Sequence, residues 1–277
     1  MPRYAMVIDL DKCNGCYNCF LACRDEHYGN DYPPYSAAQP LRGHFWLRVI
    51  EKERGQYPRV KVAYIPKLCM HCDNPPCQQA AVDGAVYKRP DGIVIIDPEK
   101  SLEQRQIVDA CPHRVIFWNE EKKIPQKCTF CAHLLDKGWQ EPRCVEACPT
   151  GALVFGDADD PGSKVSKVLH SARAEELRPE YGLKSRVKYI GLPRLFIAGT
   201  VIFGDTDECA GGVTVVLRGE GVELSTKTNN FGDFEFEGLA PGSYEVLMQH
   251  TQYQSRSINV IVKTDLYLGE NVLERMA

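Results

Sequence analysis

The sequence has no long hydrophobic run and no excess of positive charge. Across its 277 residues, no apolar segment approaches the roughly 18 residues that a membrane-spanning helix needs, so we expect no direct membrane insertion. The 33 Lys and Arg residues stand against 37 Asp and Glu residues, a net charge of −4 that gives no support to a nucleic-acid partner. A phosphate-cradling glycine loop and a Ser-His-Asp set are also missing, so we expect no catalytic residue and no bond chemistry from this chain alone.

The first residues lack the basic and apolar segment of a secretory signal. The chain opens on Met1-Pro2-Arg3-Tyr4. We therefore expect a cytoplasmic protein without structural disulfides, because disulfides persist mainly in oxidising compartments. A subunit carried across a membrane by a signal on its partner would have the same sequence features.

Cysteine is abundant, and its spacing is the main functional signal. Twelve of the 13 cysteines fall into four groups along the chain. The first group has the C-x2-C-x2-C-x3-C spacing of bacterial ferredoxins, and the last has the same order with a longer middle spacing. The groups are Cys13, Cys16, Cys19 and Cys23; Cys69, Cys72 and Cys77; Cys111 alone; and Cys128, Cys131, Cys144 and Cys148.

The ferredoxin ligation rule assigns these cysteines to three 4Fe-4S clusters. In two-cluster ferredoxins, the fourth cysteine of each run ligates the cluster that the other run holds. The rule predicts three groups of ligands, which we name set A, set B and set C after their clusters. Set A is Cys13, Cys16, Cys19 and Cys148; set B is Cys128, Cys131, Cys144 and Cys23; set C is Cys69, Cys72, Cys77 and Cys111.

The same rule defines a fourth site that has no cysteine at all. Its four positions hold Ala81, Ser101, Gln104 and Ile107. A complete four-cluster pattern would have sixteen ligand cysteines, and this chain lacks four of them. A random loss of four would empty a single site in about one case in 500, so we interpret the gap as one lost cluster site. Because a cavity costs about 24 cal/mol per Å³, we expect side chains to fill it, with Ala81, Val82 and Ile107 as apolar lining.

Other uses of these cysteines are less consistent with the spacing. C-x2-C pairs also build zinc sites, and residues 128–148 taken alone fit one. The tight first run and the Cys-Pro pairs favour clusters instead. Cys209 stands outside the pattern, and we interpret it as a bystander thiol.

Four basic side chains lie close to the predicted ligands. His71, His113 and His133 could tune a cluster potential, shuttle protons or simply pack. Lys127 precedes Cys128, where it would favour the more negative reduced cluster or remain a solvated side chain.

The expected fold class is α+β, with two nested ferredoxin-like lobes followed by an antiparallel β-sandwich or barrel. The iron-sulfur domain covers residues 1–156, with an inner lobe at about 60–120 inserted into the outer lobe. Within the outer lobe we predict a strand at Tyr4–Asp9 and a short helix at Cys19–His27. Residues 157–193 are predicted to be a strap with a helix at Ser163–Glu176 and an extended end at Val187–Ile190.

Two further segments exceed what cluster binding requires. Residues 24–60 carry six aromatic residues among prolines, glycines and charges, which predicts a looped surface that buries rings against a partner or against the chain's own lobes. Residues 194–277 alternate apolar and polar residues in about seven short runs, which predicts a small β domain without a catalytic site. Asp205, Asp207 and Glu208 in this domain are interpreted as a solvated turn rather than a calcium loop.

Taken together, these motifs resemble the iron-sulfur subunits of the dimethyl-sulfoxide-reductase superfamily. Within it, the chain is similar to the small subunits of pyrogallol-phloroglucinol transhydroxylase and resorcinol hydroxylase, and its β domain resembles Cna-B and carboxypeptidase-regulatory domains. The segments that carry the resemblance are Arg42-Gly43-His44-x-Trp46, Glu53-Arg54-Gly55-x-Tyr57-Pro58-Arg59, Cys69-Met70-His71-Cys72, residues 126–136 around Cys128 and Cys131, and the strap segments 159–161, 166–169 and 178–182.

The resemblance implies an electron-transfer subunit with three 4Fe-4S clusters. Its partner would be a large catalytic subunit that carries the molybdopterin cofactor and hydroxylates or transhydroxylates a phenol, in a heterodimer or larger assembly. The alternatives are the electron-transfer subunit of another molybdopterin oxidoreductase, a free polyferredoxin shuttle, and a scaffold that performs no redox chemistry.

Overall fold

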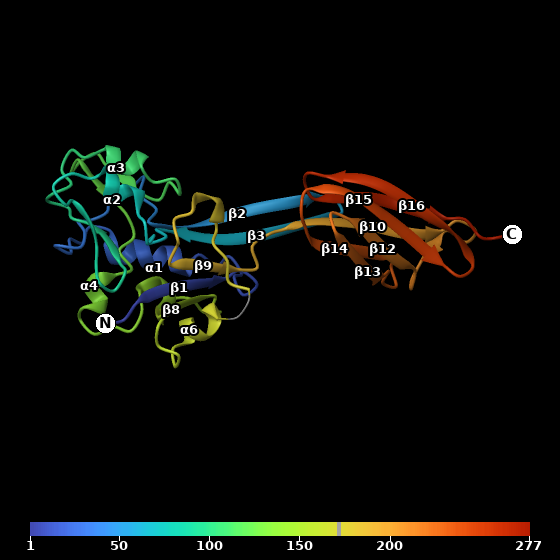
Figure 1. Ribbon diagram of the computed structural model, residues 1–277, viewed down its shortest axis with the longest axis horizontal. Helices are drawn as coiled ribbons and strands as arrows, with labels where there is room; N and C mark the ends of the chain where they lie inside the picture. Colours follow the sequence, from blue (N-terminus) through green and yellow to red (C-terminus); the bar gives the residue numbers. More distant parts are fainter. Residues whose placement is uncertain (171–172) are drawn as a thin grey trace. The chain divides into compact units, whose positions relative to one another are not determined.

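The computed structural model describes residues 1–170 and 173–277. The chain forms two compact units, coloured along the sequence in Figure 1. The first comprises Met1–Glu51 and Tyr64–Leu192, and the second comprises Lys52–Ala63 and Pro193–Ala277. The second unit therefore includes twelve residues from the N-terminal part of the chain, in contrast to the sequence-based boundary, which places them with the iron-sulfur lobes.

A three-stranded sheet supports the first unit. Its central strand β1 (Tyr4–Asp9) pairs antiparallel with β8 (Leu153–Asp157) and parallel with β9 (Val187–Ile190). Four consecutive β1 residues are buried, as expected for a strand that is covered on both faces. Helix α6 (Lys164–Leu169) packs on β1 and β8 with Val165 in the core (Figure 1).

The other elements of the first unit are short and support the cysteine loops. Helix α1 (Asn18–His27) is the longest helix of the described residues. Two small hairpins are formed by β4 with β5, in the inner lobe, and by β6 with β7, at its C-terminal boundary. The remaining bounds are β4 Val86–Lys88, β5 Val94–Ile96, β6 Phe117–Asn119, β7 Ile124–Gln126, α2 Pro76–Ala80, α3 Gln106–Asp109, α4 Ala132–Leu135, α5 Arg143–Glu146 and the 3-10 turn η1 Pro179–Tyr181.

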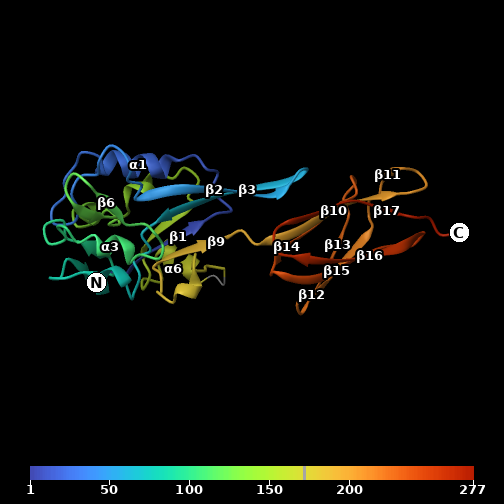
Figure 2. The same ribbon diagram turned by 90° about the horizontal axis from the view of Figure 1, so that it is seen from above.

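Strands β2 (Leu47–Gln56) and β3 (Arg59–Leu68) pair as a long hairpin, visible from above in Figure 2. Its tip belongs to the second unit and is held there by ion pairs. Arg54 donates to Asp265 at 3.2 Å and to Glu237 at 2.7 Å, and both Arg54 and Asp265 are about nine-tenths buried. Lys61 of the tip also pairs with Glu237, at 3.1 Å.

The rest of the second unit consists of two four-stranded sheets around one hydrophobic core. The first sheet has the order β11-β10-β14, with β17 parallel to β10; the second has the order β13-β12-β15-β16. Ile197, Phe234, Val215 and Met248 contribute to this core from both sheets. The bounds are β10 Leu195–Phe203, β11 Glu208–Cys209, β12 Thr214–Gly219, β13 Val222–Lys227, β14 Asp233–Leu239, β15 Gly242–His250, β16 Tyr253–Val262 and β17 Leu266–Leu273.

Several predicted elements are confirmed and others are wrong. The strand at Tyr4–Asp9 is confirmed, and the helix predicted from Cys19 begins one residue earlier. The helix predicted at Ser163–Glu176 ends at Leu169; residues 171–172 lie outside the described part, and 173–176 are not helical. The strap is not merely a connector, because its β9 completes the sheet of the first unit.

The aromatic segment and the barrel alternative are also corrected. Within the predicted looped segment 24–60, residues 47–56 form a strand rather than a loop, because they pair with β3. Trp46 is 1% exposed and belongs to the chain's own core, whereas Tyr57 is 90% exposed. Neither sheet of the second unit closes into a barrel within residues 193–277. None of the helices described is long and apolar enough to span a membrane.

Candidate iron-sulfur sites

Helix α1 presents two predicted ligands and a histidine on one face. Cys19, Cys23 and His27 follow one another at intervals of four residues, which aligns side chains along a helix, and all three are buried. The Nε2 atom of His27 lies 3.8 Å from Sγ of Cys131. Helix α1 therefore contributes Cys19 to set A and Cys23 to set B. Its His27 contacts Cys131, a second thiol of set B.

Two C-x2-C loops have the same local geometry. The amide N–H of His71 donates to Sγ of Cys69 at 3.5 Å, and that of Phe130 donates to Sγ of Cys128 at 3.4 Å. His71 and Phe130 occupy the same position in their loops and have positive φ angles of 44° and 53°. Such amide hydrogen bonds favour the thiolate form that ligates iron.

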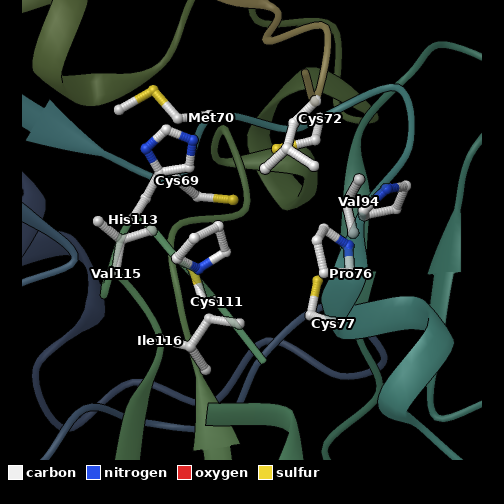
Figure 3. Close-up of a pocket in the computed structure, with 13 residues that line it drawn as sticks. Cys69, Met70, Cys72, Pro76, Cys77, Val94, Cys111, His113, Val115 and Ile116 are labelled. Atoms are coloured by element: carbon white, nitrogen blue, oxygen red, sulfur yellow. The ribbon is translucent and has the colours of Figure 1, made fainter. Parts of the chain in front are cut away.

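The four cysteines of set C surround one cavity. Cys69, Cys72, Cys77 and Cys111 line the same pocket, together with apolar residues such as Val94 and Ile116 (Figure 3). Burial and the charges of the other three cysteines raise the pKa of the Cys72 thiol. Within the described residues, no group of three or more His, Cys, Asp or Glu side chains is arranged to hold a single metal ion.

The cysteines of set A are neighbours in space although Cys148 is distant in sequence. Burial and the charges of Cys13 and Cys148 raise the pKa of the Cys19 thiol to about 12. Burial opposes thiolate formation at Cys148, but the backbone amides of residues 150, 152 and 153 and the Thr150 hydroxyl hold its pKa below the usual range. Cys16 is exposed, so this set reaches the surface.

The cysteines of set B are all buried and also lie together. Burial and the charges of Cys128 and Cys131 raise the pKa of the Cys23 thiol. Burial and the charges of Cys131, Cys128 and Cys23 do the same for Cys144. The structure therefore brings together the cysteines that the crossover rule groups in each set.

The donor chemistry of these sites fits 4Fe-4S clusters. Each set offers four thiols, the ligand group that holds a cubane. A bound cluster supplies one-electron redox chemistry, and the residues of the chain determine where it lies and how stable each redox state is. Because burial keeps most of these thiols protonated, loading a site must release protons.

His113 and His71 add donors near set C that have no partner in the described residues. Burial and the Lys67 charge lower the pKa of His113 to about 4, so its ring is neutral; it lines the set C cavity with both ring nitrogens unpartnered (Figure 3). Nδ1 of His71 accepts the Val94 amide N–H at 3.0 Å, which puts the ring proton on the unpartnered Nε2. His133 instead pairs through Nε2 with Glu26, at 2.9 Å.

Side chains fill the place of the predicted lost site. Ser101 and Ile107 are 0% exposed, and Ile107 packs with Ala81 in the core of the inner lobe. The Gln104 amide accepts from the Val82 N–H at 3.0 Å and donates to the carbonyls of Val82 and Lys100. The expectation that Val82 lines the space is wrong: its side chain is 54% exposed, and only its backbone reaches Gln104.

Sequence reasoning missed His27, Phe130 and the burial of Lys127. The four-residue interval from Cys23 to His27 could have revealed the shared helix face. Of the two alternatives for Lys127, the solvated side chain is wrong, because the residue is 2% exposed. No local pattern could have predicted that burial, since it depends on segments distant in sequence.

Comparisons with known proteins identify the family of this chain. The family described as a 4Fe-4S dicluster domain matches residues 60–158, and the carboxypeptidase regulatory-like domain matches residues 197–269. The chain is 44% identical to the pyrogallol hydroxytransferase small subunit of Pelobacter acidigallici, over 89% of this chain and 90% of that protein. The chain belongs to the iron-sulfur subunits of the dimethyl-sulfoxide-reductase superfamily.

Other members of this family match a smaller part of the chain. A tetrathionate reductase subunit of Salmonella typhimurium is 38% identical over 70% of this chain and 75% of its own length. The arsenate respiratory reductase iron-sulfur subunit of a Shewanella species is 34% identical over 68% of this chain and 96% of its own. The protein is thus an iron-sulfur electron-transfer subunit of the molybdopterin oxidoreductase type.

Proposed function

We propose that this chain binds three 4Fe-4S clusters and conducts electrons between a molybdopterin catalytic subunit and an external acceptor. The observation that carries the proposal is the grouping of the cysteines. Thiols from distant parts of the chain, such as Cys19 with Cys148 and Cys77 with Cys111, lie together as the crossover rule requires. Four thiols per site and no oxygen ligand match cubane chemistry.

The contacts between the sets support the order A, B, C for electron transfer. Set A meets set B on helix α1, where Cys19 and Cys23 are one turn apart. Set B meets set C where the ring of Phe130, from the Cys128 loop, stacks on the ring of His71, from the Cys69 loop, with centroids 3.8 Å apart. Because set A includes the exposed Cys16, we place the exchange of electrons with the partner or the acceptor at this end.

The partner that we propose is a phenol hydroxylase or transhydroxylase subunit. The hydroxytransferase small subunit matches 89% of the chain, whereas the tetrathionate and arsenate reductase subunits match 70% and 68%. In a hydroxylase, the chain would carry away the electrons released as water-derived oxygen enters the ring. A transhydroxylase has no net electrons to export, so its clusters would serve only internal redox adjustment.

Cluster content tests the first part of the proposal. The anaerobically purified protein should contain iron and sulfide for three cubanes. Cys111→Ser should remove one third of the iron, because it breaks set C alone. Cys209→Ser is the matched control: this exposed thiol lies outside the three sets, and its loss should leave the iron unchanged. Iron for two or four cubanes in the unsubstituted protein would refute the assignment.

Assembly tests the second part. We expect the chain to form a stable complex with the product of a neighbouring gene that carries molybdopterin-binding motifs, and the complex to oxidise or rearrange a polyhydroxylated benzene. A chain that remains monomeric beside that product in gel filtration, yet reduces soluble acceptors freely, would favour the polyferredoxin shuttle instead.

A further inference from the structure

Lys127 is a buried cation between two of the predicted cluster sites. Its side chain is 2% exposed. The ammonium Nζ donates to the carbonyl oxygens of Val94 and of Cys128, the latter at 3.0 Å. Across residues 1–170 and 173–277, no Asp or Glu forms an ion pair with it.

A buried ammonium without an anion is unfavourable. Carbonyl dipoles replace part of its hydration, but removing a full charge from water is costly unless an opposite charge lies nearby. Lys127 lies near thiols of two sets. Burial raises the pKa of Cys77 in set C and of Cys128 in set B, and the Lys127 charge opposes this rise, so it favours the thiolate form of both.

Buried contacts around Lys127 connect the two sets. The rings of His71 and Phe130, one from each C-x2-C loop, stack with centroids 3.8 Å apart and an angle of 28° between planes. Val94 of β5 donates its N–H to His71 and accepts from Lys127 at its carbonyl. His71, Val94 and Phe130 are all at most 1% exposed. The ammonium is therefore held in place between set B and set C by fully buried contacts.

We propose that Lys127 is the shared counterion of the clusters of set B and set C and raises the reduction potentials of both. This inference rests on the three-cluster assignment proposed above. A ligated cubane carries net negative charge, which grows by one unit on reduction. A fixed positive charge nearby therefore stabilises the reduced state more than the oxidised state. Lys127 acts through this charge and is a positioning residue rather than a catalytic one.

The test is an EPR-monitored redox titration of the full-length, cluster-loaded protein. Lys127→Met removes the charge while keeping a long side chain, and Lys127→Arg keeps the charge. Lys123→Met is the matched control, because this lysine lies four residues away and is 61% exposed. The variants Cys131→Ser and Cys77→Ser assign the signals of clusters B and C.

In Lys127→Met, the ratio of reduced to oxidised cluster at the original midpoint should fall about tenfold for both B and C. For a one-electron couple, this is a shift of about 59 mV to lower potential. Cluster A should be unchanged, as should all potentials in Lys123→Met, and Lys127→Arg should restore most of the shift. If Lys127→Met loses clusters B and C while Lys127→Arg keeps them, the charge requirement is equally supported.

Three results would overturn the inference. The first is full iron with unshifted B and C potentials in Lys127→Met. The second is an equal shift of all three clusters. The third is loss of clusters in Lys127→Arg as well, which would assign the residue a packing role. Iron for fewer than three cubanes in the unsubstituted protein would instead refute the underlying cluster assignment, and this is measured before any potential.

Discussion

Replacing Ile107 should reveal how much stability depends on the filled fourth site. Ile107 of α3 is 0% exposed and packs in a core with Val86, Ile96 and Ile116. Ile107→Ala removes three carbon groups, worth about 0.8 kcal/mol each in transfer free energy, and leaves a cavity. Since buried Ile→Ala changes cost about 2–5 kcal/mol in total, we expect the free energy of local unfolding to fall by at least about 2 kcal/mol.

Native-state hydrogen exchange measures this change in the full-length protein. The amides of β4 and β5, which surround Ile107, should exchange at least about 30-fold faster, because 1.4 kcal/mol corresponds to a factor of ten. Leu102→Ala is the matched control: Leu102 is in the same lobe but 57% exposed, so exchange should change little. Equal exchange rates in the two variants, or extra iron bound by Ile107→Ala, would refute the view that side chains have replaced a cluster here.

Two further substitutions test the loop of set A and the hairpin tip. Gly15→Ala would place Cβ 2.5 Å from the Tyr64 ring of β3, so the iron content should fall by one cubane. Gly29→Ala is the matched control: it has the same φ of +70° but no neighbour within 4 Å, and it should retain all iron. Arg54→Ala leaves a buried carboxylate unpaired and should lower the free energy of unfolding of the second unit by about 3 kcal/mol in thermal denaturation. Arg218 is 49% exposed, so Arg218→Ala should change the free energy of unfolding by less than about 0.5 kcal/mol. Similar losses in both arginine variants would contradict the view that ion pairs of the hairpin tip stabilise the second unit.

Much of the first unit could be predicted because its signals are local or follow from ligand spacing. The apolar run in Tyr4–Asp9 and the cysteine loop that precedes α1 are read directly from neighbouring residues. The β2–β3 hairpin was missed, because its aromatic and charged composition resembles that of a loop. Its long strands are stabilised by pairing with each other, and its tip by ion pairs with residues more than 170 positions away.

The sequence by itself predicted the ligand sets, because cysteine spacing and the crossover rule depend only on the order of residues along the chain. It also predicted which four positions form the lost cluster site. Only the tertiary structure decided that Lys127 is buried, that His71 stacks on Phe130, and that residues 52–63 belong with the C-terminal unit. These features depend on the packing of segments distant in sequence, and the electrostatic environment of a side chain is fixed only when those segments exclude water from it.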